Sequence, residues 1–411
     1  MLRIVPVASS LADAREVQRI TAEVLRRLDA QRWNPRIVSS VDPGDRSPLA
    51  FVVTTGGTEQ QVVQLAEQWD GPVVLLAHPT HNSLPASLEI LARLAQIGRR
   101  GRIVLAREND PTTRSFTDCV ASMQARSSLH GKRLGVVGAP SDWLVASPAA
   151  QLPLREQWGV ELVDVPMEHL VSAINSAAEG DARTALASWQ DGACARREPS
   201  DRDLLDAARV SVALREIVRD HRLDACSVRC FDLVTGLRTT GCLALSQLID
   251  TNIMAGCEGD VPSTLTMMWM HALTGQRPFM ANPQDVCVDD NSLWLAHCTI
   301  ARSLVRSYRL RSHFESSLGV GIEGELDDGP ATLARVGGSA LDRLFATDAE
   351  ILGHEFLETR CRTQVRARLV EPVSSLLSHP LGNHHILVRG HHARTLRAYA
   401  DLYLAPLPAS A

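Results

Sequence analysis

Lysine is almost absent from this chain of 411 residues: Lys132 is the single one, and the other basic residues are arginines. A Schiff base to pyridoxal phosphate or to a carbonyl substrate needs a lysine amine, so only Lys132 could support that chemistry. The chain also lacks an excess of positive charge, with a net charge of −5 at neutral pH. Nucleic-acid-binding proteins usually carry such an excess, and we expect no nucleic-acid partner.

Long apolar runs and paired cysteines are missing as well. The longest apolar runs, such as Pro72–Ala77, are far shorter than the ~20 residues that a membrane helix needs, and the first residues do not have the pattern of a secretory signal. None of the nine cysteines is spaced as C-x-x-C, which argues against a cysteine zinc site. Reduced core thiols are the better interpretation. We therefore expect a cytoplasmic protein with no membrane partner.

Strand-like and helix-like segments alternate along the first part of the chain, which predicts parallel sheets covered on both faces. A second block of this kind starts at Gly131, and residues 179–202 are polar and predicted to be irregular. After about Ala301, partial alternation and turns indicate antiparallel hairpins, with a short helix near 393–402. The predicted fold class is α/β, with two Rossmann-like parallel-sheet domains and a mostly antiparallel β domain. Their predicted bounds are 1–129, 130–300 and 301–411.

Neither of the two common phosphate-binding patterns, G-x-G-x-x-G and G-x-x-x-x-G-K-[ST], occurs in the chain. Nucleotide binding is therefore not supported, although a layered parallel sheet alone would have allowed it.

Four segments place polar residues between apolar stretches, where a polar side chain needs a partner or a bound cation. They are Cys257–Asp260, Pro278–Asp285, Trp294–Thr299 and the histidine-rich segment 379–392. In the first, Glu258 and Asp260 flank a glycine. Asp260 also stands before Val261-Pro262, which is typical of a helix N-cap.

The other three segments supply an amide and imidazoles. Asn282 follows a strand-like run, where a simple turn is an alternative. His297 ends a short apolar strand, where a hydrogen-bonded core histidine is an alternative. His384 and His385 are adjacent, so in a strand they point to opposite faces. Carboxylate, amide and imidazole groups form an oxygen-rich, thiol-free set, which favours Mn²⁺ or a similar divalent ion over structural zinc.

The order of these motifs resembles the L-fucose isomerase and L-arabinose isomerase superfamily. The matching motifs, within about residues 130–400, are Glu-Gly-Asp, Thr-Gly, Phe-Met-Ala-Asn, Leu-Ala-His-Cys and Gly-Asn-His-His. Members of that family have two Rossmann-like domains and a β-rich domain, bind Mn²⁺ and interconvert aldoses and ketoses. The resemblance implies metal ligands at Glu258, Asn282, His297 and His384, with His385 as the neighbouring candidate for the last of these. It also implies a homo-oligomer whose active site is closed by the N-terminal domain of a neighbour, and the turn Thr54–Gly57 is a candidate for that role.

Asn282 stands where the resemblance implies a second catalytic carboxylate. An amide oxygen can bind a metal but cannot shuttle the proton that isomerisation through an enediol requires. Glu258 would then move the proton, and Asp260 or Asp285 could assist. The predicted function is a divalent-metal-dependent aldose–ketose isomerase acting on a sugar or modified sugar. The alternatives are a non-catalytic sugar-binding or regulatory protein and a metal-dependent epimerase or lyase on the same scaffold.

Three further residues are candidates for binding the carbohydrate substrate. Ser141 and Trp143 lie on a predicted strand-end loop, where the tryptophan could stack on a sugar face or pack between domains. His385 neighbours the predicted ligand His384. Arginines could meet an anionic group on the substrate or could be surface residues; examples are Arg229, Arg238 and Arg277.

Overall fold

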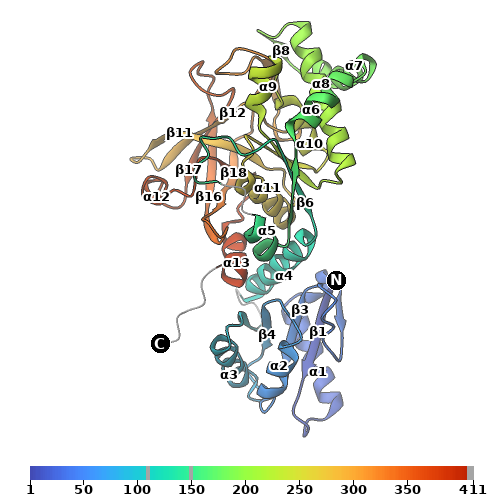
Figure 1. The fold of residues 1–411 in the computed structure, drawn as a ribbon. Helices are drawn as coiled ribbons and strands as arrows, with labels where there is room; N and C mark the ends of the chain where they lie inside the picture. The colour runs from blue at the N-terminus through green and yellow to red at the C-terminus, as the bar shows by residue number, and fades with distance from the viewer. Residues whose placement is uncertain (108–111, 148–150, 405–411) are drawn as a thin grey trace. The chain divides into compact units, whose positions relative to one another are not determined.

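The computed structural model describes residues 1–107, 112–147 and 151–404 (Figure 1). The chain divides into two compact units, one formed by residues 1–128 together with 394–411 and the other by residues 129–393. Each unit contains a parallel sheet, and the second also contains a closed antiparallel barrel, so the predicted fold class is confirmed. The three predicted domain ranges stay predictions. Among the helices in the described ranges, none has the length and apolarity needed to cross a membrane.

The first unit is built on a parallel sheet with the strand order β2-β1-β3-β4-β5. Its strands are β1 (Leu2–Val7), β2 (Pro35–Ile37), β3 (Leu49–Val53), β4 (Val73–Ala77) and β5 (Gly101–Leu105). Its helices are α1 (Ala14–Arg27), η1 (Ala30–Trp33), α2 (Glu59–Ala66), α3 (Ser83–Gln96), α4 (Thr112–Leu129) and α13 (Ala393–Tyr403). Strands such as β4 are apolar throughout because both faces of a parallel sheet are buried.

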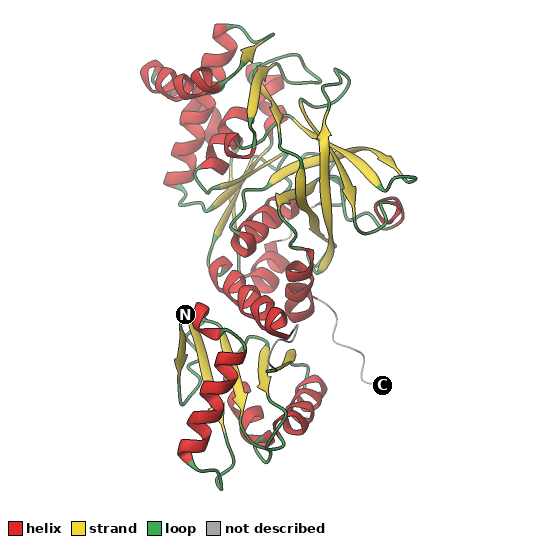
Figure 2. Cartoon of the chain, turned by 180° about the vertical axis from the view of Figure 1, so that it is seen from behind, coloured by secondary structure: helices red, strands yellow, loops and turns green. Residues whose placement is uncertain are grey.

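Helices cover both faces of this sheet (Figure 2). Alternate strand residues pack on one side with α1, α4 and α13 and on the other side with α2 and α3. Helix α13 is fastened to α4, since Arg394 and Thr395 both bind the buried carboxylate of Asp118. The C-terminal helix therefore stabilises the N-terminal unit, whereas the sequence suggested that it ends the β-rich domain.

The second unit contains a parallel sheet with the strand order β10-β9-β6-β7. Its strands are β6 (Arg133–Val137), β7 (Glu161–Val165), β9 (Ala225–Val228) and β10 (Met254–Cys257). Its helices are α5 (Gln151–Trp158), α6 (Met167–Ser176), α7 (Glu179–Gly192), α8 (Asp201–Asp220), α9 (Cys230–Leu237), α10 (Cys242–Asp250) and α11 (Val261–Thr274). Helix α7 corrects the expectation of irregular structure at 179–202: its few apolar residues, such as Trp189, are enough to bury one face.

Antiparallel structure begins at Phe279 and not after 301 as the sequence suggested. The closed barrel has the order β11-β12-β17-β16-β15-β18, and Asn282 and His297 lie on it. Its strands are β11 (Phe279–Cys287), β12 (Ser292–His297), β15 (Gly329–Gly337), β16 (Arg343–His354), β17 (Thr363–Leu369) and β18 (His385–Arg389). A small sheet joins β8 (Ala195–Arg196), β13 (Ser307–Arg311) and β14 (Gly321–Glu325), and the short helices η2 (Arg302–Leu304) and α12 (Ser374–Ser378) complete the unit.

Helix α11 connects the sheet to the barrel, since it contacts β9 and β10 on one side and β15 and β18 on the other. The strand register then brings polar residues to one end of the barrel. His385 pairs with Ala281, and Asn282 pairs with Ala296. The neighbouring residues His384 and His297 therefore lie beside Asn282, near the end of β10.

Candidate metal centre

The turn after β10 fixes the position of Glu258. Its backbone φ is 63°, a conformation that costs a residue other than glycine about 1–3 kcal/mol. Gly259 follows with a φ of 70°, and a Cβ there would lie 2.4 Å from the carbonyl oxygen of Ala139. The backbone N–H of Ser141 donates a hydrogen bond to the carbonyl oxygen of Glu258 at 2.8 Å. Strain of this kind, held by its surroundings, is typical of functional sites.

The side chains of Glu258, His297 and His384 meet in one place. Each offers a ligand atom, and these atoms lie within 4.8 Å of one another. All three residues are buried, and the two imidazole rings meet edge to face with centroids 5.6 Å apart. Ligand atoms that bind one ion at about 2.0–2.2 Å lie up to about 4.4 Å apart. The cluster therefore has close to the spacing that a shared cation requires.

Nε2 of His384 and Oδ1 of Asn282 are among the buried atoms that have no hydrogen-bond partner within the described residues. The Nε2 atom lies 3.5 Å from Oε1 of Glu258. Leaving a buried polar atom unpaired costs about 1–3 kcal/mol. A cation would satisfy both atoms, so the residues present fit a divalent metal with nitrogen and oxygen ligands.

Asp260 lies behind His384 and does not line the cavity. Its Oδ2 atom accepts a hydrogen bond from Nδ1 of His384 at 2.9 Å. Its Oδ1 atom accepts one from the backbone N–H of Ser263, also at 2.9 Å, and caps α11. The Arg335 guanidinium lies 3.5 Å from Oδ2. The sequence suggested a catalytic role, but these contacts make Asp260 a helix cap and a positioning residue for His384.

The charges in this cluster depend on one another. Burial opposes ionisation of Glu258, but His384 and the Trp143 indole outweigh it and lower the pKa of Glu258 to about 2. Burial also opposes a charge on His384, yet Asp260 and Glu258 raise the pKa of that imidazole to about 9. Burial and the neighbouring His384 lower the pKa of His297 to about 3. Arg335 balances part of the negative charge of the two carboxylates, and either a proton on His384 or a divalent cation can supply the rest.

A cavity of about 350 Å³ opens beside the cluster. It is lined by Trp143, Cys230, Phe231, Val234, Thr240, Gly241, Cys242, Cys257, Glu258, Asn282, His297, Cys298, His313, Glu315, Cys361 and Asn383. The indole N–H of Trp143 donates to Oε2 of Glu258 at 2.6 Å. The Trp143 ring meets Phe231 edge to face at 4.9 Å, and Phe231 meets His313 at 5.5 Å.

Several lining residues were missed by reasoning from the sequence, His313 above all. It lies two residues beyond the end of strand β13, so a polar residue near a strand end was the signal that could have found it. Burial lowers the pKa of His313 below its usual value, so its ring is neutral at pH 7. Asn383 was not predicted as a separate candidate, because the motif Gly-Asn-His-His pointed to the two histidines that follow it.

Other predicted residues lie outside the cavity. His385 is buried against Phe345, with ring centroids 5.4 Å apart, and its Nδ1 atom bonds the Asn383 carbonyl. Ser141 contacts Glu258 only through its backbone and does not line the cavity. Neither side chain lines this cavity, and the substrate-binding role expected of both from the sequence stays a prediction. His385 lies on β18, which turns its side chain away from the face that His384 occupies.

The candidates for proton transfer and for anion binding also lie elsewhere. Asp285 is exposed and pairs with Arg360 at 3.2 Å. Arg229 binds Asp142 and Asp232. Arg277 binds a backbone carbonyl. The cavity lining includes none of the three arginines Arg229, Arg238 and Arg277. The described lining contains no lysine or arginine.

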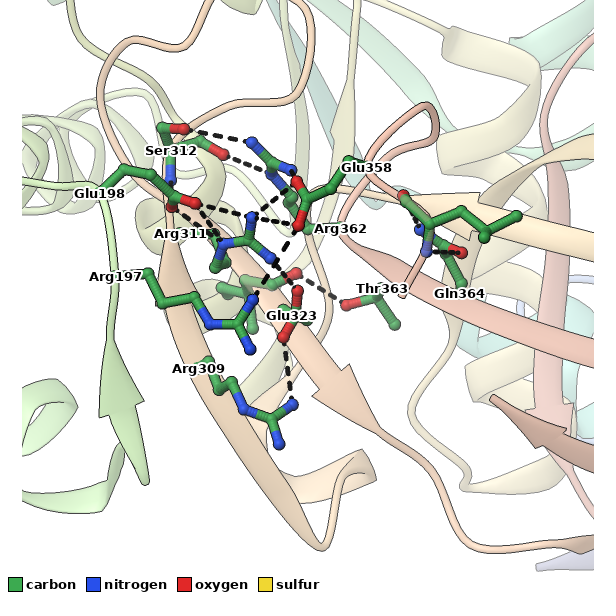
Figure 3. Close-up of polar contacts among 12 residues, drawn as sticks. Arg197, Glu198, Arg309, Arg311, Ser312, Glu323, Glu358, Arg362, Thr363 and Gln364 are labelled. Atoms are coloured by element: carbon green, nitrogen blue, oxygen red, sulfur yellow. Dashed lines mark hydrogen bonds and ion pairs between the residues drawn. The ribbon is translucent and has the colours of Figure 1, made fainter. Parts of the chain in front are cut away.

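A cluster of arginines and glutamates holds two segments of the cavity wall (Figure 3). Arg311, on β13, is buried and binds Glu198, Glu323 and Glu358. Arg362 binds Glu358 at 2.9 Å and the backbone carbonyl of Ser312 at 2.8 Å. These contacts tie the segment that leads to His313 to the loop that contains Cys361.

Comparison with known proteins agrees with a site for sugar chemistry. No protein-family model matches the chain. Over 211 residues it is 28% identical to the sulfoquinovose isomerase of Alkalicoccus urumqiensis, covering 49% of this chain and 47% of that protein. The sulfoquinovose isomerases of Priestia aryabhattai and Priestia megaterium are each 23% identical over 185 residues, covering 43% of this chain and 40% of theirs. The chain thus spans less than half the length of the curated relatives that it matches. These names support a relation to sugar isomerases. They do not show that the chain belongs to the L-fucose isomerase superfamily.

Proposed function

We propose that this chain is a divalent-metal-dependent aldose–ketose isomerase that acts on a sugar. The observation that carries the proposal is the cluster of Glu258, His297 and His384 at the wall of a cavity large enough for a monosaccharide. The isomerase names of the relatives support the same chemistry. The proposal includes membership of the L-fucose and L-arabinose isomerase superfamily, on the strength of the motif order.

Glu258, His297 and His384 would hold the ion, with the amide oxygen of Asn282 as a fourth ligand. Carboxylate, amide and imidazole ligands suit Mn²⁺, which we propose as the cofactor. When bound, the cation would supply Lewis-acid stabilisation for the negative charge of an enediolate. The protein's part is to keep Glu258 ionised and to orient His384 through Asp260.

Proton transfer between the two sugar carbons needs a base in the cavity. Neither Asp260 nor Asp285 reaches it. Four groups that could accept a proton line the cavity: Glu258, His297, His313 and Glu315. His297 is assigned to the ion and Glu315 is exposed, which leaves the Glu258 carboxylate and the neutral imidazole of His313. We assign proton transfer to them jointly, because Asn282 cannot accept a proton.

The substrate that suits this cavity is a neutral sugar. The relatives are named for sulfoquinovose, but no lysine or arginine is among the described lining residues. The exposed acid Glu315 does line the cavity. Away from the metal ion, an anionic group bound there would meet no cationic side chain of the described lining. Hydroxyl groups find partners in Asn282, Asn383 and Thr240, and the rings of Trp143 and Phe231 offer an apolar surface.

We also propose a homo-oligomer in which a second copy covers the cavity. Trp143 and Val145, on the loop after β6, are 52% and 89% exposed. Large apolar side chains exposed together often mark an interface. In the N-terminal unit, Thr55 and Gly57 line an open hollow after β3 and are candidates for the covering surface. Measurement of the molar mass in solution tests this; a monomeric active enzyme would contradict it.

Turnover measured with and without metal tests the proposed reaction. Neutral aldoses and a sulfonated aldose are incubated with protein after chelation and after Mn²⁺ is restored, in heavy water. We expect deuterium at the carbon next to the carbonyl, only with Mn²⁺ and mainly with neutral sugars. Binding without exchange would favour the regulatory alternative, and a product with a changed stereocentre or a broken C–C bond would favour an epimerase or a lyase. Full activity after exhaustive metal removal would contradict the metal assignment.

A further inference from the structure

A completely buried arginine lies behind the metal centre. Arg335, on β15, has no exposed surface, and neither has Asp260, whose Oδ2 atom lies 3.5 Å from Nη1 of Arg335. An arginine is almost never buried completely unless partners hold its charge and its N–H groups. Arg335 is not among the residues that line the cavity, so it does not meet a sugar there. Its role therefore depends on the groups that it holds.

All three nitrogens of the Arg335 guanidinium donate hydrogen bonds. Nε donates to the carbonyl oxygen of Leu381 at 3.0 Å. Nη1 donates to the hydroxyl of Ser263 at 2.7 Å and to the carbonyl oxygen of His384. Nη2 donates to the hydroxyl of Ser147 at 2.6 Å. A planar guanidinium presents its donors in fixed directions from three atoms, whereas the donors of a lysine share one nitrogen, so a lysine cannot make this set of contacts.

Three segments that build the site meet at this guanidinium. The start of α11 includes its N-cap Asp260, which orients the ring of His384. The segment before β18 carries His384, whose backbone carbonyl Arg335 also binds. The loop after β6 carries both Ser147 and Trp143. Arg335 thus acts on His384 in two ways, through the carboxylate behind its ring and through its own backbone.

Gly382, the first residue of the motif Gly-Asn-His-His, packs directly against the guanidinium. Its φ is 141°, and a Cβ there would lie 2.2 Å from Nη2 of Arg335. A side chain at position 382 would therefore push the guanidinium away from its partners. Gly353, on β16, has almost the same φ, 142°, but a Cβ there would meet nothing within 4 Å. The two glycines thus share the backbone requirement and differ in the contact with Arg335.

We propose that Arg335 is a positioning residue of the metal centre, and that position 382 is a glycine because the guanidinium occupies the space of a side chain. The hydrogen bonds of Arg335 to the start of α11 and to the carbonyl oxygen of His384 fix both partners of the contact between Asp260 and His384. Groups that orient a metal ligand in this way raise the affinity for the metal. The inference rests on the metal centre of the proposed function and on no particular sugar or reaction.

Titration of the full chain with Mn²⁺ tests the proposal. Arg335→Lys keeps the charge and loses the fork of donors, so we expect Mn²⁺ affinity to fall about tenfold, the lower end of the effect for groups behind a metal ligand. Gly382→Ala should cause a similar fall, whereas Gly353→Ala should bind Mn²⁺ as the wild type does. Arg343→Lys, at an exposed position on β16, is the control for the arginine. Circular dichroism at the assay temperature identifies the variants that are folded, so that loss of stability is not mistaken for loss of affinity.

Wild-type Mn²⁺ affinity in folded Arg335→Lys would overturn the proposal, because Arg335 would then only stabilise the fold. Equal affinities in Gly382→Ala and Gly353→Ala would overturn it as well. If Arg335→Lys does not fold, the comparison of the two glycine variants decides. A wild type that binds Mn²⁺ but isomerises no sugar would contradict the proposed function and not this role of Arg335, since Mn²⁺ binding reports on that role directly. A wild type that does not bind Mn²⁺ would overturn both.

Discussion

The carboxylate of Asp260 accepts a hydrogen bond from Nδ1 of His384 at 2.9 Å, and neither side chain has any exposed surface. The two residues are 124 positions apart in the chain. Asp260 caps the helix that follows β10, and His384 precedes the barrel strand β18. A carboxylate behind a metal-binding imidazole fixes its tautomer and orientation, so this contact leaves Nε2 of His384 free to face Glu258.

Replacing Asp260 with Asn tests that contact. Asn is also a good N-cap, so helix α11 should keep its start, while the imidazole loses its charged partner. We expect Mn²⁺ affinity to fall about 10–100-fold, measured by titration calorimetry. Asp285→Asn, at an exposed ion pair outside the cavity, should leave the affinity unchanged. Equal affinities for Asp260→Asn and the wild type would show that the contact does not orient the ligand.

Trp143→Phe removes the N–H that binds Oε2 of Glu258 but keeps an aromatic ring. Hydrogen bonds to charged groups contribute about 1.5–3 kcal/mol, and half-exposure of Trp143 favours the lower end, so kcat/KM should fall about tenfold. The pKa of Glu258 should rise, because the indole is one of the groups that lower it. Steady-state kinetics across pH measure both effects, with Trp294→Phe as the control. A change in KM alone would indicate that the indole only contacts the sugar.

Asn282→Asp introduces the carboxylate that the motif order implies at this position. A negative ligand in place of the orphaned amide oxygen should tighten Mn²⁺ binding about tenfold or more, since hard cations prefer carboxylate oxygen. Asn282→Ala should weaken it. Equilibrium dialysis against Mn²⁺ compares the two, and Asn252→Asp, in an exposed turn, serves as the control. Identical affinities in the Asp and Ala variants would exclude residue 282 from the ligand set.

Arg311→Leu tests the cluster that holds the cavity wall. The change leaves buried Glu323 with Arg309 as its remaining cationic partner, and breaking a buried ion pair costs about 3–5 kcal/mol. Thermal unfolding at pH 7 should show the loss, whereas Arg202→Leu, at an exposed pair, should show almost none.

The same variant should change the response to acid. Burial opposes ionisation of Glu198, but Arg311 outweighs it and lowers the pKa of Glu198 to about 2. A lowered carboxyl pKa stabilises the folded state above the usual value of 4.5, and that stabilisation is lost as the pH falls towards 2. The difference in Tm between wild type and Arg311→Leu should therefore shrink between pH 5 and pH 3. A constant difference would contradict the assigned ion pair.

Local patterns were sufficient for much of the fold. The apolar run Pro72–Ala77 contains strand β4 (Val73–Ala77), because a strand buried on both faces must be apolar throughout. The start of the barrel was misplaced, since β11 is apolar only at its first residues and becomes polar towards its exposed end. Helix α7 was missed for a related reason: its sequence is mostly polar, and packing against α8 decides its structure.

The sequence by itself determined which groups are available for chemistry: one lysine, no cysteine zinc motif, and the acid, amide and histidines of the four polar segments. Only the tertiary structure decided where each group lies and what it contacts. Glu258 and Asp260 are two residues apart, yet the turn at Gly259 directs one to the cavity and the other behind His384. Of the adjacent histidines, the register of β18 places His384 beside Glu258, at the proposed metal centre, and His385 against Phe345. The contact between Asp260 and His384 joins segments more than a hundred residues apart, so it depends on sheet register and on closure of the barrel. Burial and neighbouring charges set the pKa values of these side chains. No local sequence pattern encodes either effect.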